Sequence, residues 1–320
     1  MKILVPESFS TNFKDIVDQS IQNYGFEVVF DNGKDVLQDV DVLLMNYFVF
    51  KDLKNFLKRL PNLRFIQTLS AGVEKINFEI IDPKIILCSN AGAYSIPVAE
   101  HAISMALALA KNLQKTTKEL KDGIFVQFQE GIRLKNSTAL VIGYGGIGGY
   151  IGKLCEGLGM KVIKVGRNRS KTERKMDGTL DDIGSFLTSA DFVFICTPSN
   201  KYTKNLFDGE MLSKMKEDSV LVNIARADII DQEALYDHMS SHPEFRAGID
   251  VWWDEPGRNK PFEQKFPITS LPNFIGSPHN SSVVKGIFEE SLKLAFENIA
   301  KFMKGEKPNN IVNREDYLND

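Results

Sequence analysis

The sequence predicts an α/β protein made of two doubly wound, parallel-sheet domains. Short apolar runs alternate with helical patterns along the chain, an order typical of parallel sheets covered by helices. Its 320 residues exceed what one hydrophobic core usually holds, about 250–300 residues, so two domains are expected. The strands expected in the first series are Ile3–Pro6, Glu27–Phe30, Val42–Asn46, Phe65–Leu69 and Ile85–Cys88.

A long apolar helix is expected to begin near Ser95, where Pro97 suits a first helical turn. The stretch Val98–Ala110 holds strong helix formers and is apolar nearly all round, so this helix should be buried and cross between the domains. A second strand series follows it. Its expected strands are Thr138–Ile142, Lys161–Val165, Asp191–Cys196, Ser219–Ile224, Phe245–Asp250 and Asn273–Gly276.

The last apolar helix is expected over about Val284–Met303, after the second sheet is complete. We therefore expect it to return the chain to the first domain, and we expect the polar tail after Gly305 to be loosely held. One domain would consist of residues 1–99 and 283–320, and the inserted domain of residues 100–282.

Composition and charge argue against several kinds of partner. The net charge of −3 comes without a basic block, so neither nucleic acid nor an anionic membrane is expected to bind. No apolar run reaches about 18 residues, and the N-terminus lacks a signal-peptide pattern, so a cytoplasmic location is expected. The three cysteines, Cys88, Cys155 and Cys196, have no metal-ligand spacing, and no metal site is expected.

A glycine-rich loop follows the strand Thr138–Ile142 and leads into a helical pattern. It reads Gly143-Tyr144-Gly145-Gly146-Ile147-Gly148. In this strand–loop–helix context Gly143 permits a tight turn, Gly145 lets the backbone approach a pyrophosphate, and Gly148 lets helix and strand pack closely. The free N–H groups of the helix would then face the phosphates. The inserted domain is therefore expected to be a Rossmann-type dinucleotide-binding domain.

The end of the next strand predicts which dinucleotide binds. Proteins that bind NAD usually carry a carboxylate here to hold the ribose 2′-hydroxyl. This chain instead has Gly166, Arg167, Asn168 and Arg169. Guanidinium groups bind a 2′-phosphate well, so a preference for NADP(H) over NAD(H) is expected. If these arginines are only solvated surface charges, either cofactor could serve.

Three polar residues follow strand ends in the second series: Arg226, Glu255 and His279. Ligands of open α/β sheets bind outside the carboxyl ends of the strands, where all three would lie. An arginine can bind a carboxylate, and a Glu–His pair can supply a proton. These are the groups that reduction of a 2-keto acid requires.

The chain resembles the D-isomer-specific 2-hydroxyacid dehydrogenase family along nearly its whole length. The family's arginine, glutamate and histidine signatures are matched in order, and the glycine loop and the segment that leads into the long helix precede them. These matches are residues 223–231, 250–256 and 277–280, with residues 143–148 and 90–101 before them. The resemblance also implies a flavodoxin-like substrate domain and a homodimer, for which the long apolar helix after Ser95 is a candidate surface.

The resemblance implies a role for each matching position. His279 would protonate the carbonyl oxygen, Glu255 would orient the His279 ring, and Arg226 would bind the substrate carboxylate. Asp250 would hold the nicotinamide carboxamide. The residues expected to line the cofactor are Thr197, Pro198, Ile224 and Ala225.

The first domain adds a candidate substrate loop, Ser70-Ala71-Gly72-Val73, whose small residues leave backbone N–H groups free for a carboxylate. Tyr47, Phe48 and Phe50 could contact a substrate side chain or belong to the core. Two positions depart from the family pattern: Ala227 stands where glycine is usual, and Asn280 where an apolar residue is usual.

The expected reaction is hydride transfer between NADP(H) and a small 2-keto acid such as glyoxylate or hydroxypyruvate. A formate-type dehydrogenase normally has Gln at the position of Glu255, which argues against that alternative. A phosphite-type dehydrogenase has Arg, Glu and His at all three positions, so the sequence leaves this alternative open. A corepressor-like dinucleotide sensor would need no catalytic trio and would usually carry further interaction segments, which this sequence lacks.

Overall fold

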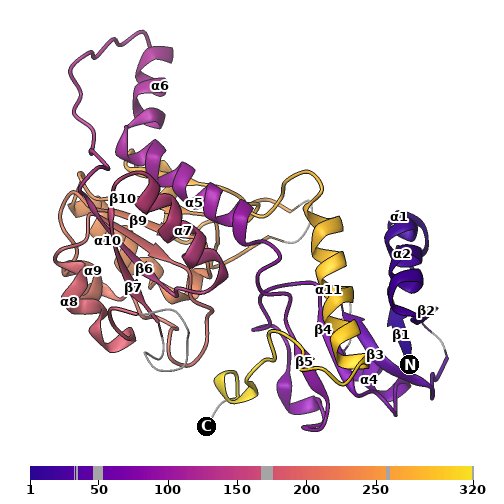
Figure 1. Ribbon diagram of the computed structural model, residues 1–320. Helices are drawn as coiled ribbons and strands as arrows, with labels where there is room; N and C mark the ends of the chain where they lie inside the picture. Colours follow the sequence, from indigo (N-terminus) through magenta and orange to yellow (C-terminus); the bar gives the residue numbers. More distant parts are fainter. Residues whose placement is uncertain (32, 34, 46–52, 167–175, 257–259, 319–320) are drawn as a thin grey trace. The chain divides into compact units, whose positions relative to one another are not determined.

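The computed structural model describes residues 1–31, 33, 35–45, 53–166, 176–256 and 260–318 (Figure 1). The chain divides into two compact units. The first unit comprises Met1–Tyr94 and Val284–Asp320, and the second unit comprises Ser95–Val283. Each unit contains one sheet in which every strand pair is parallel. This confirms the predicted fold class of two parallel-sheet α/β domains.

The sheet of the first unit has the strand order β2-β1-β3-β4-β5, the flavodoxin-like order. Its strands are β1 (Lys2–Val5), β2 (Glu27–Phe30), β3 (Val40–Met45), β4 (Phe65–Thr68) and β5 (Ile86–Cys88). All five form where the apolar runs predicted them. The bounds of β2 are as predicted, and the ends of the other four differ by one or two residues.

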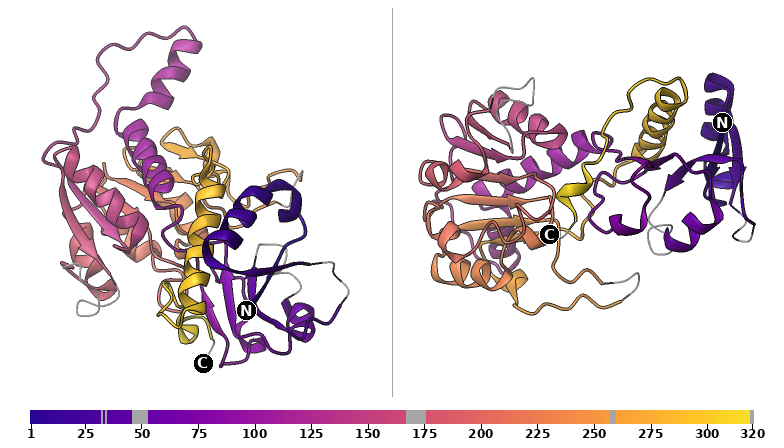
Figure 2. Two further views of the ribbon diagram at one scale, coloured as in Figure 1. Left: turned by 45° about the vertical axis from the view of Figure 1, so that its right-hand side comes forward. Right: turned by 90° about the horizontal axis from the view of Figure 1, so that it is seen from below.

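Alternating residues of these strands face two separate hydrophobic clusters. Ile3 and Val5 point to the cluster that includes helices α1 (Phe9–Asn12), α2 (Lys14–Tyr24) and α11 (Ile287–Met303). Leu4, between them, points to the opposite cluster with α4 (Leu53–Arg59). Figure 2 shows α11 beside the strands of the first unit. The last helix thus completes the core that the N-terminal strands begin.

The second unit carries a six-stranded sheet of order β11-β10-β9-β8-β6-β7. The order reverses between β6 and β8, and ligands of doubly wound sheets bind at such a point. The strands are β6 (Thr138–Ile142), β7 (Lys161–Val165), β8 (Phe192–Ile195), β9 (Val220–Asn223), β10 (Arg246–Ile249) and β11 (Phe274–Gly276). The helices are α5 (Ser95–Ala110), α6 (Leu113–Lys121), α7 (Gly146–Gly157), α8 (Ile183–Leu187), α9 (Gly209–Ser213) and α10 (Gln232–Ser241).

Helix α5 is the long apolar helix that the sequence predicts, and most of its residues are buried. It packs against α7 and against β9, β10 and β11 of its own unit. Its apolar side chains are therefore covered within the chain, although Ile96 is exposed. This leaves little of α5 to serve as the expected subunit surface. A run of exposed apolar side chains lies farther along, on α6 and the segment after it.

The expectation of a loosely held tail is wrong. Arg314 donates hydrogen bonds to the backbone carbonyls of Ile81, Asp82 and Ile85, and the Tyr317 ring stacks on Phe78 with 5.2 Å between centroids. Polar composition misleads here because the tail is held by side-chain bonds to backbone carbonyls, which leave no periodic apolar pattern in the sequence.

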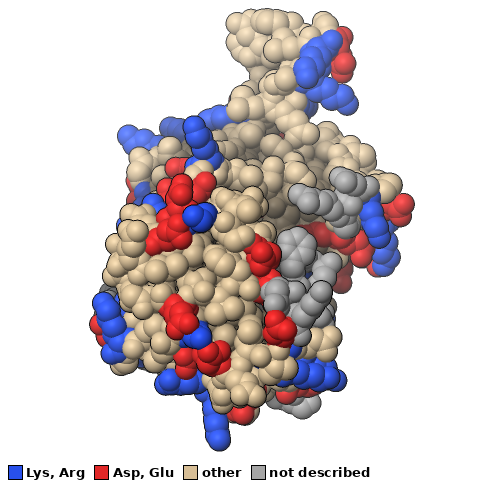
Figure 3. Space-filling view, turned by 90° about the vertical axis from the view of Figure 1, so that its right-hand side faces the viewer, with Lys and Arg blue, Asp and Glu red and all other residues tan. Residues whose placement is uncertain are grey.

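The surface carries charges of both signs. On the face drawn in Figure 3, acidic and basic side chains lie interspersed rather than in a field of one sign. Among the described residues, no helix is both long enough and apolar enough to cross a membrane.

His238 on α10 is half-buried. The ring lies 4.2 Å from the His242 ring, and the Phe245 edge packs at 4.7 Å, both between centroids. The buried Nε2 atom has no hydrogen-bond partner among the described residues. Burial, with a smaller contribution from His242, lowers the pKa of His238 from 6.5 to about 4.

Replacing His238 with Phe should make the stability of the protein less sensitive to acid. Since the folded-state pKa lies below the unfolded one, the unfolded chain takes up this proton first as the pH falls. The wild type should therefore lose stability from about pH 6.5 down to about pH 4. The free energy of unfolding should fall by at most about 1.4 kcal/mol per pH unit, and by less because water partly reaches the ring. Urea unfolding of both proteins at pH 7 and pH 5 measures the free energy of unfolding. If the wild type and the variant lost equal stability between these pH values, His238 would not be the source of the acid sensitivity.

Candidate active site

The glycine loop adopts the geometry that its sequence predicts. Gly143 follows β6 with φ +92°, and a Cβ built there would lie 2.7 Å from the backbone of Cys196 and Thr197. A Cβ on Gly148 would lie 2.2 Å from the Gly143 carbonyl oxygen. Neither position tolerates a side chain, because each lets two backbone segments approach closely. The loop therefore lies at the switch point between β6 and β8.

The middle glycine leaves space on its outer side. A Cβ built on Gly145 would meet nothing within 4 Å, and Gly145 is the N-cap of the twelve-residue helix α7. The backbone N–H groups of the first turn, which begins at Gly146, point out of this end. Open space beside a helix N-terminus fits a pyrophosphate, so the loop suits a dinucleotide.

The other residues expected to line the cofactor follow neighbouring strands. Thr197 and Pro198 follow β8 after Cys196, with Thr197 buried and Pro198 exposed. Ile224 and Ala225 are buried and follow β9. Tyr144 and Ile147 of the glycine loop are half-buried. All of these residues lie on the carboxyl edge of the second unit's sheet.

Arg226 occupies a turn that a buried amide holds in place. Asn223, the last residue of β9, is fully buried. Its Oδ1 accepts a hydrogen bond from the Ala225 N–H at 3.0 Å, and its Nδ2 donates to the Arg226 carbonyl at 2.9 Å. The Asn223 side chain thus closes the turn that presents Arg226. The sequence reading assigned Asn223 no role.

Glu255 and His279 form a direct pair. The His279 Nδ1 lies 2.5 Å from Glu255 Oε1, and both side chains are partly exposed. An ionised carboxylate only accepts hydrogen bonds, so Nδ1 carries the hydrogen and Nε2 is the atom directed to other partners. His279 has φ +51°, a left-handed conformation that costs a non-glycine residue about 1–2 kcal/mol. The surrounding contacts must hold this turn.

Asp250 is one source of those contacts. Its carboxylate, fully buried after β10, accepts hydrogen bonds from the backbone N–H groups of Asn280 at 3.0 Å and Ser281 at 3.1 Å. It also accepts one from the Ser277 hydroxyl at 2.5 Å. The expected role toward a nicotinamide carboxamide stays a prediction, and the observed role is to brace the turn that carries His279.

Two cavities lined by described residues of the second unit bear on the candidate site. One of about 530 Å³ is lined by Trp252, Phe262 and Phe274, with Glu255 and His279 in its wall. The Glu–His pair thus borders a pocket that has three aromatic side chains in its wall. This side of the pair suits apolar groups better than charged ones.

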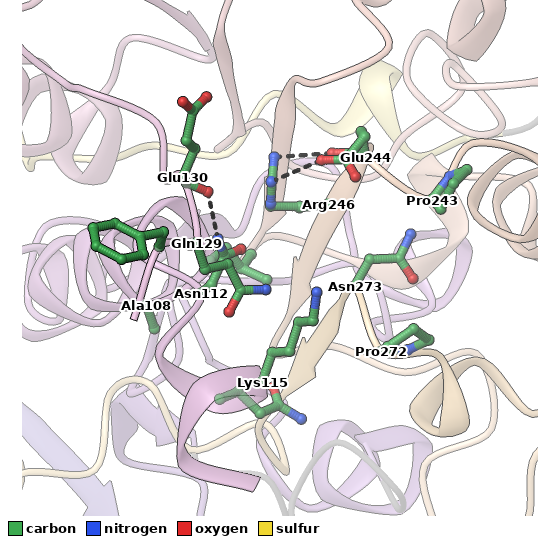
Figure 4. A pocket seen from close by; sticks show the side chains of 13 residues that line it. Ala108, Asn112, Lys115, Gln129, Glu130, Pro243, Glu244, Arg246, Pro272 and Asn273 are labelled. Carbon is green, nitrogen blue, oxygen red and sulfur yellow. Dashed lines mark hydrogen bonds and ion pairs between the residues drawn. The ribbon is translucent and has the colours of Figure 1, made fainter. Parts of the chain in front are cut away.

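The second cavity, of about 470 Å³, lies at the start of β10 and before β11, the edge opposite to the catalytic turns. Figure 4 shows Arg246 in its wall, paired with Glu244. Asn112 bonds there to the backbone carbonyl of Glu130 at 2.9 Å. With its arginine held by a carboxylate, this cavity is a poorer candidate for an acidic substrate.

The candidate substrate loop belongs to the first unit. It follows β4, and the Ser70 hydroxyl donates to the Gly72 carbonyl at 2.7 Å, while Ala71 is half-buried and Val73 is buried. The Asn90 N–H donates to the Ser70 carbonyl at 2.9 Å. The turn is thus fastened to the segment after β5, and its substrate role stays a prediction.

Some predicted residues fall outside the described part of the chain. They are Arg167, Asn168 and Arg169, and the aromatic residues Tyr47, Phe48 and Phe50. Gly166 is described, and a Cβ there would make only ordinary contacts, the nearest at 3.4 Å to the Met176 sulfur. The described neighbours of Gly166 therefore do not require glycine at this strand end. Within the described residues, no group of three or more His, Cys, Asp or Glu could hold a metal ion.

A family model for the NAD binding domain of D-isomer-specific 2-hydroxyacid dehydrogenases matches residues 103–281. D-3-phosphoglycerate dehydrogenase of Methanocaldococcus jannaschii is 30% identical over 281 residues, which cover 87% of this chain and 52% of that protein. The chain thus spans about half the length of this relative. Glyoxylate reductase of Pyrococcus furiosus is 28% identical, covering 87% of this chain and 84% of the relative.

Solved structures share the whole architecture. One from Pyrobaculum aerophilum, named for formate dehydrogenase, is 28% identical and covers 99% of both chains with a TM-score of 0.82. The similarity therefore extends over both units of the chain, beyond the span of the family model.

Proposed function

Because this chain belongs to the D-isomer-specific 2-hydroxyacid dehydrogenase family, we propose that it is an oxidoreductase that interconverts a small 2-keto acid and its D-2-hydroxy acid with a nicotinamide cofactor. The observation that carries the proposal is the His279–Glu255 pair, 2.5 Å between Nδ1 and Oε1, on the sheet edge that also carries Arg226. Glyoxylate and hydroxypyruvate are the proposed substrates. The name of the Pyrococcus relative supports the first of them.

The cofactor would lie along the glycine loop, with its pyrophosphate at the N-terminus of α7 and with Thr197, Pro198, Ile224 and Ala225 beside it. When bound, it supplies the hydride. Arg226 binds the substrate carboxylate and polarises the carbonyl. His279 gives the proton on Nε2 to the carbonyl oxygen, and takes it back in the reverse direction. Glu255 accepts the hydrogen bond from Nδ1 and fixes the orientation of the ring.

Turnover of 2-keto acids tests this function. NADPH or NADH is mixed with glyoxylate, hydroxypyruvate, pyruvate, phenylpyruvate or a branched keto acid, and the nicotinamide absorbance is followed. Arg226→Ala and His279→Gln should each lower kcat/KM by roughly 10²–10³-fold, because each removes a charge-assisted contact to the transition state. Arg64→Ala, at an exposed position of the first unit, is the matched control and should retain wild-type activity.

Formate and phosphite with NADP⁺ or NAD⁺ complete the panel. Formate is a necessary test because the Pyrobaculum structure bears that name, although Glu255 stands where the formate type normally has Gln. Oxidation of formate or phosphite without reduction of any keto acid would contradict the proposal. Binding of NADP(H) with no turnover at all would favour a dinucleotide sensor.

The proposed cofactor is NADP(H), with NAD(H) as the alternative. The support is the absence of a carboxylate at Gly166, together with Arg167 and Arg169 in the sequence that follows. A carboxylate here would hold a 2′-hydroxyl and repel a 2′-phosphate. Among the described residues, the atoms nearest to a Cβ on Gly166 belong to the Met176 side chain, at ordinary contact distances of 3.4–3.6 Å, so this position is suited to an acidic substitution.

Gly166→Asp should lower the ratio of kcat/KM for NADPH to kcat/KM for NADH by about tenfold or more. Gly166→Ala adds the Cβ without the charge and serves as the control, with an expected ratio close to that of the wild type. A wild-type enzyme that prefers NADH about tenfold or more would refute the assignment.

A homodimer is the proposed assembly, and the surface we assign to it is an apolar arm on α6 and the segment after it. The arm comprises Leu113, Leu120, Ile124, Phe125, Val126 and Phe128. Phe125 and Phe128 are 78% and 92% exposed, whereas monomeric proteins rarely leave such a continuous apolar segment uncovered. Figure 1 shows the arm projecting from the second unit, where a second copy could cover it.

Sedimentation velocity tests the assembly. The wild type should sediment with twice the 36.0 kDa chain mass, and Phe125→Ser/Phe128→Ser should shift it toward the monomer. Tyr202→Ser, also at an exposed position of the second unit, is the control for a lost surface aromatic residue. A monomeric wild type at micromolar concentration would contradict the assignment. A cytoplasmic location stays a prediction.

A further inference from the structure

The turn that carries His279 is held by polar contacts rather than by packing. We call residues 277–281 the histidine turn. Pro278, His279 and Asn280 are exposed, so apolar burial does little to fix them. The start of the turn is held at Ser277, whose N–H donates to the Ile249 carbonyl at 3.0 Å and whose carbonyl accepts from Trp252 Nε1 at 2.8 Å. The part around His279 is held by the buried Asp250 carboxylate, which accepts the Asn280 and Ser281 N–H groups. The turn therefore depends on how firmly Asp250 and its remaining partner, the Ser277 hydroxyl, are themselves held.

Ser277 links this carboxylate to helix α5. Its hydroxyl lies 2.5 Å from Asp250 Oδ1 and 2.8 Å from Nε2 of His101. An ionised carboxylate can only accept, so the Ser277 hydrogen points to Asp250 and the oxygen is left to accept. His101 must then carry its hydrogen on Nε2 and donate it to Ser277. The same Nε2 lies 4.0 Å from Asp250 Oδ1.

His101, the first donor in this series of hydrogen bonds, lies on the packed helix α5. The helix packs against β9, β10 and β11, the strands whose carboxyl ends carry the catalytic turns. His101 lies in the second turn of the helix and its side chain is 29% exposed, so its ring is partly held by its surroundings. A donor fixed in this way restricts Ser277 more than a water molecule would.

We propose that His101 is a positioning residue for His279, acting through Ser277 and Asp250. The three side chains form one directed series of hydrogen bonds, from His101 to Ser277 to Asp250, which ends on the backbone of the histidine turn. This series holds His279 in its left-handed conformation with Nδ1 on Glu255. The inference rests on the proposed function, in which His279 is the proton donor.

A kinetic comparison tests the proposal with NADPH and glyoxylate as the probes. Ser277→Ala and His101→Phe should each lower kcat by about tenfold, because a small displacement of His279 impairs proton transfer more than substrate binding. KM for glyoxylate and NADPH should change less than about threefold. Ser277→Thr keeps the hydroxyl and His101→Gln keeps an N–H donor, so both should recover most of the lost kcat.

Ser104→Ala is the matched control on the same helix, where the hydroxyl bonds only to the Glu100 carbonyl of its own helix, and it should leave kcat unchanged. Wild-type kcat in Ser277→Ala or in His101→Phe would overturn the proposal. It would also be overturned if Ser277→Thr were as slow as Ser277→Ala, or if KM rose as much as kcat fell.

Histidine NMR tests the geometry without turnover. The chain has four histidines, so ¹⁵N-histidine labelling gives a spectrum that can be assigned by substitution. The ring signals of His279 should move in Ser277→Ala and in His101→Phe, while those of His238 and His242 stay in place. Unmoved His279 signals would overturn the proposal. If the signals move but the wild type reduces no keto acid, the positioning role stands and the proposed function fails.

Discussion

The polar groups at the carboxyl ends of β9 and β10 must be satisfied inside the protein, and this requirement shapes the candidate site. Asn223 and Asp250 are both fully buried at these strand ends. A buried amide or carboxylate is costly unless it is hydrogen-bonded. Each one meets this need by bonding to the backbone of a turn close by, and those turns present Arg226 and His279. The hydrogen bonds that satisfy each buried side chain therefore also hold the turn that carries the functional residue.

The cofactor side of the site depends on steric exclusion instead. Gly143 and Gly148 allow the loop, β8 and α7 to approach more closely than any side chain would permit, while Gly145 leaves its outer side open. Close backbone contacts therefore fill the inner side of the glycine loop, while its outer side at Gly145 stays accessible to phosphates. Binding and proton transfer can be arranged along one edge because parallel strands end together there.

Much of this could be predicted from the sequence. Every described strand forms at a predicted apolar run, and the 2.5 Å Glu255–His279 pair joins two residues that their positions after strand ends and the family motifs both indicated. Periodicity could not show that Arg314 anchors the tail, because bonds to backbone carbonyls leave no pattern. Nor could it assign His101 or Ser277, since their link spans residues far apart in the chain. The role of Asn223 could have been predicted, because an asparagine at a strand end often bonds to the backbone of the turn that follows.

A crystal structure of the protein with NADP⁺ and oxamate, an unreactive analogue of a 2-keto acid, would show whether Arg226 and His279 bind the substrate together. We expect Arg226 to bind the oxamate carboxylate and Nε2 of His279 to donate to the neighbouring oxygen. The bonds from Glu255 to His279 and from Asp250 to the histidine turn should persist. Oxamate bound away from Arg226, or a His279 ring that turns away from Glu255 toward solvent, would contradict it.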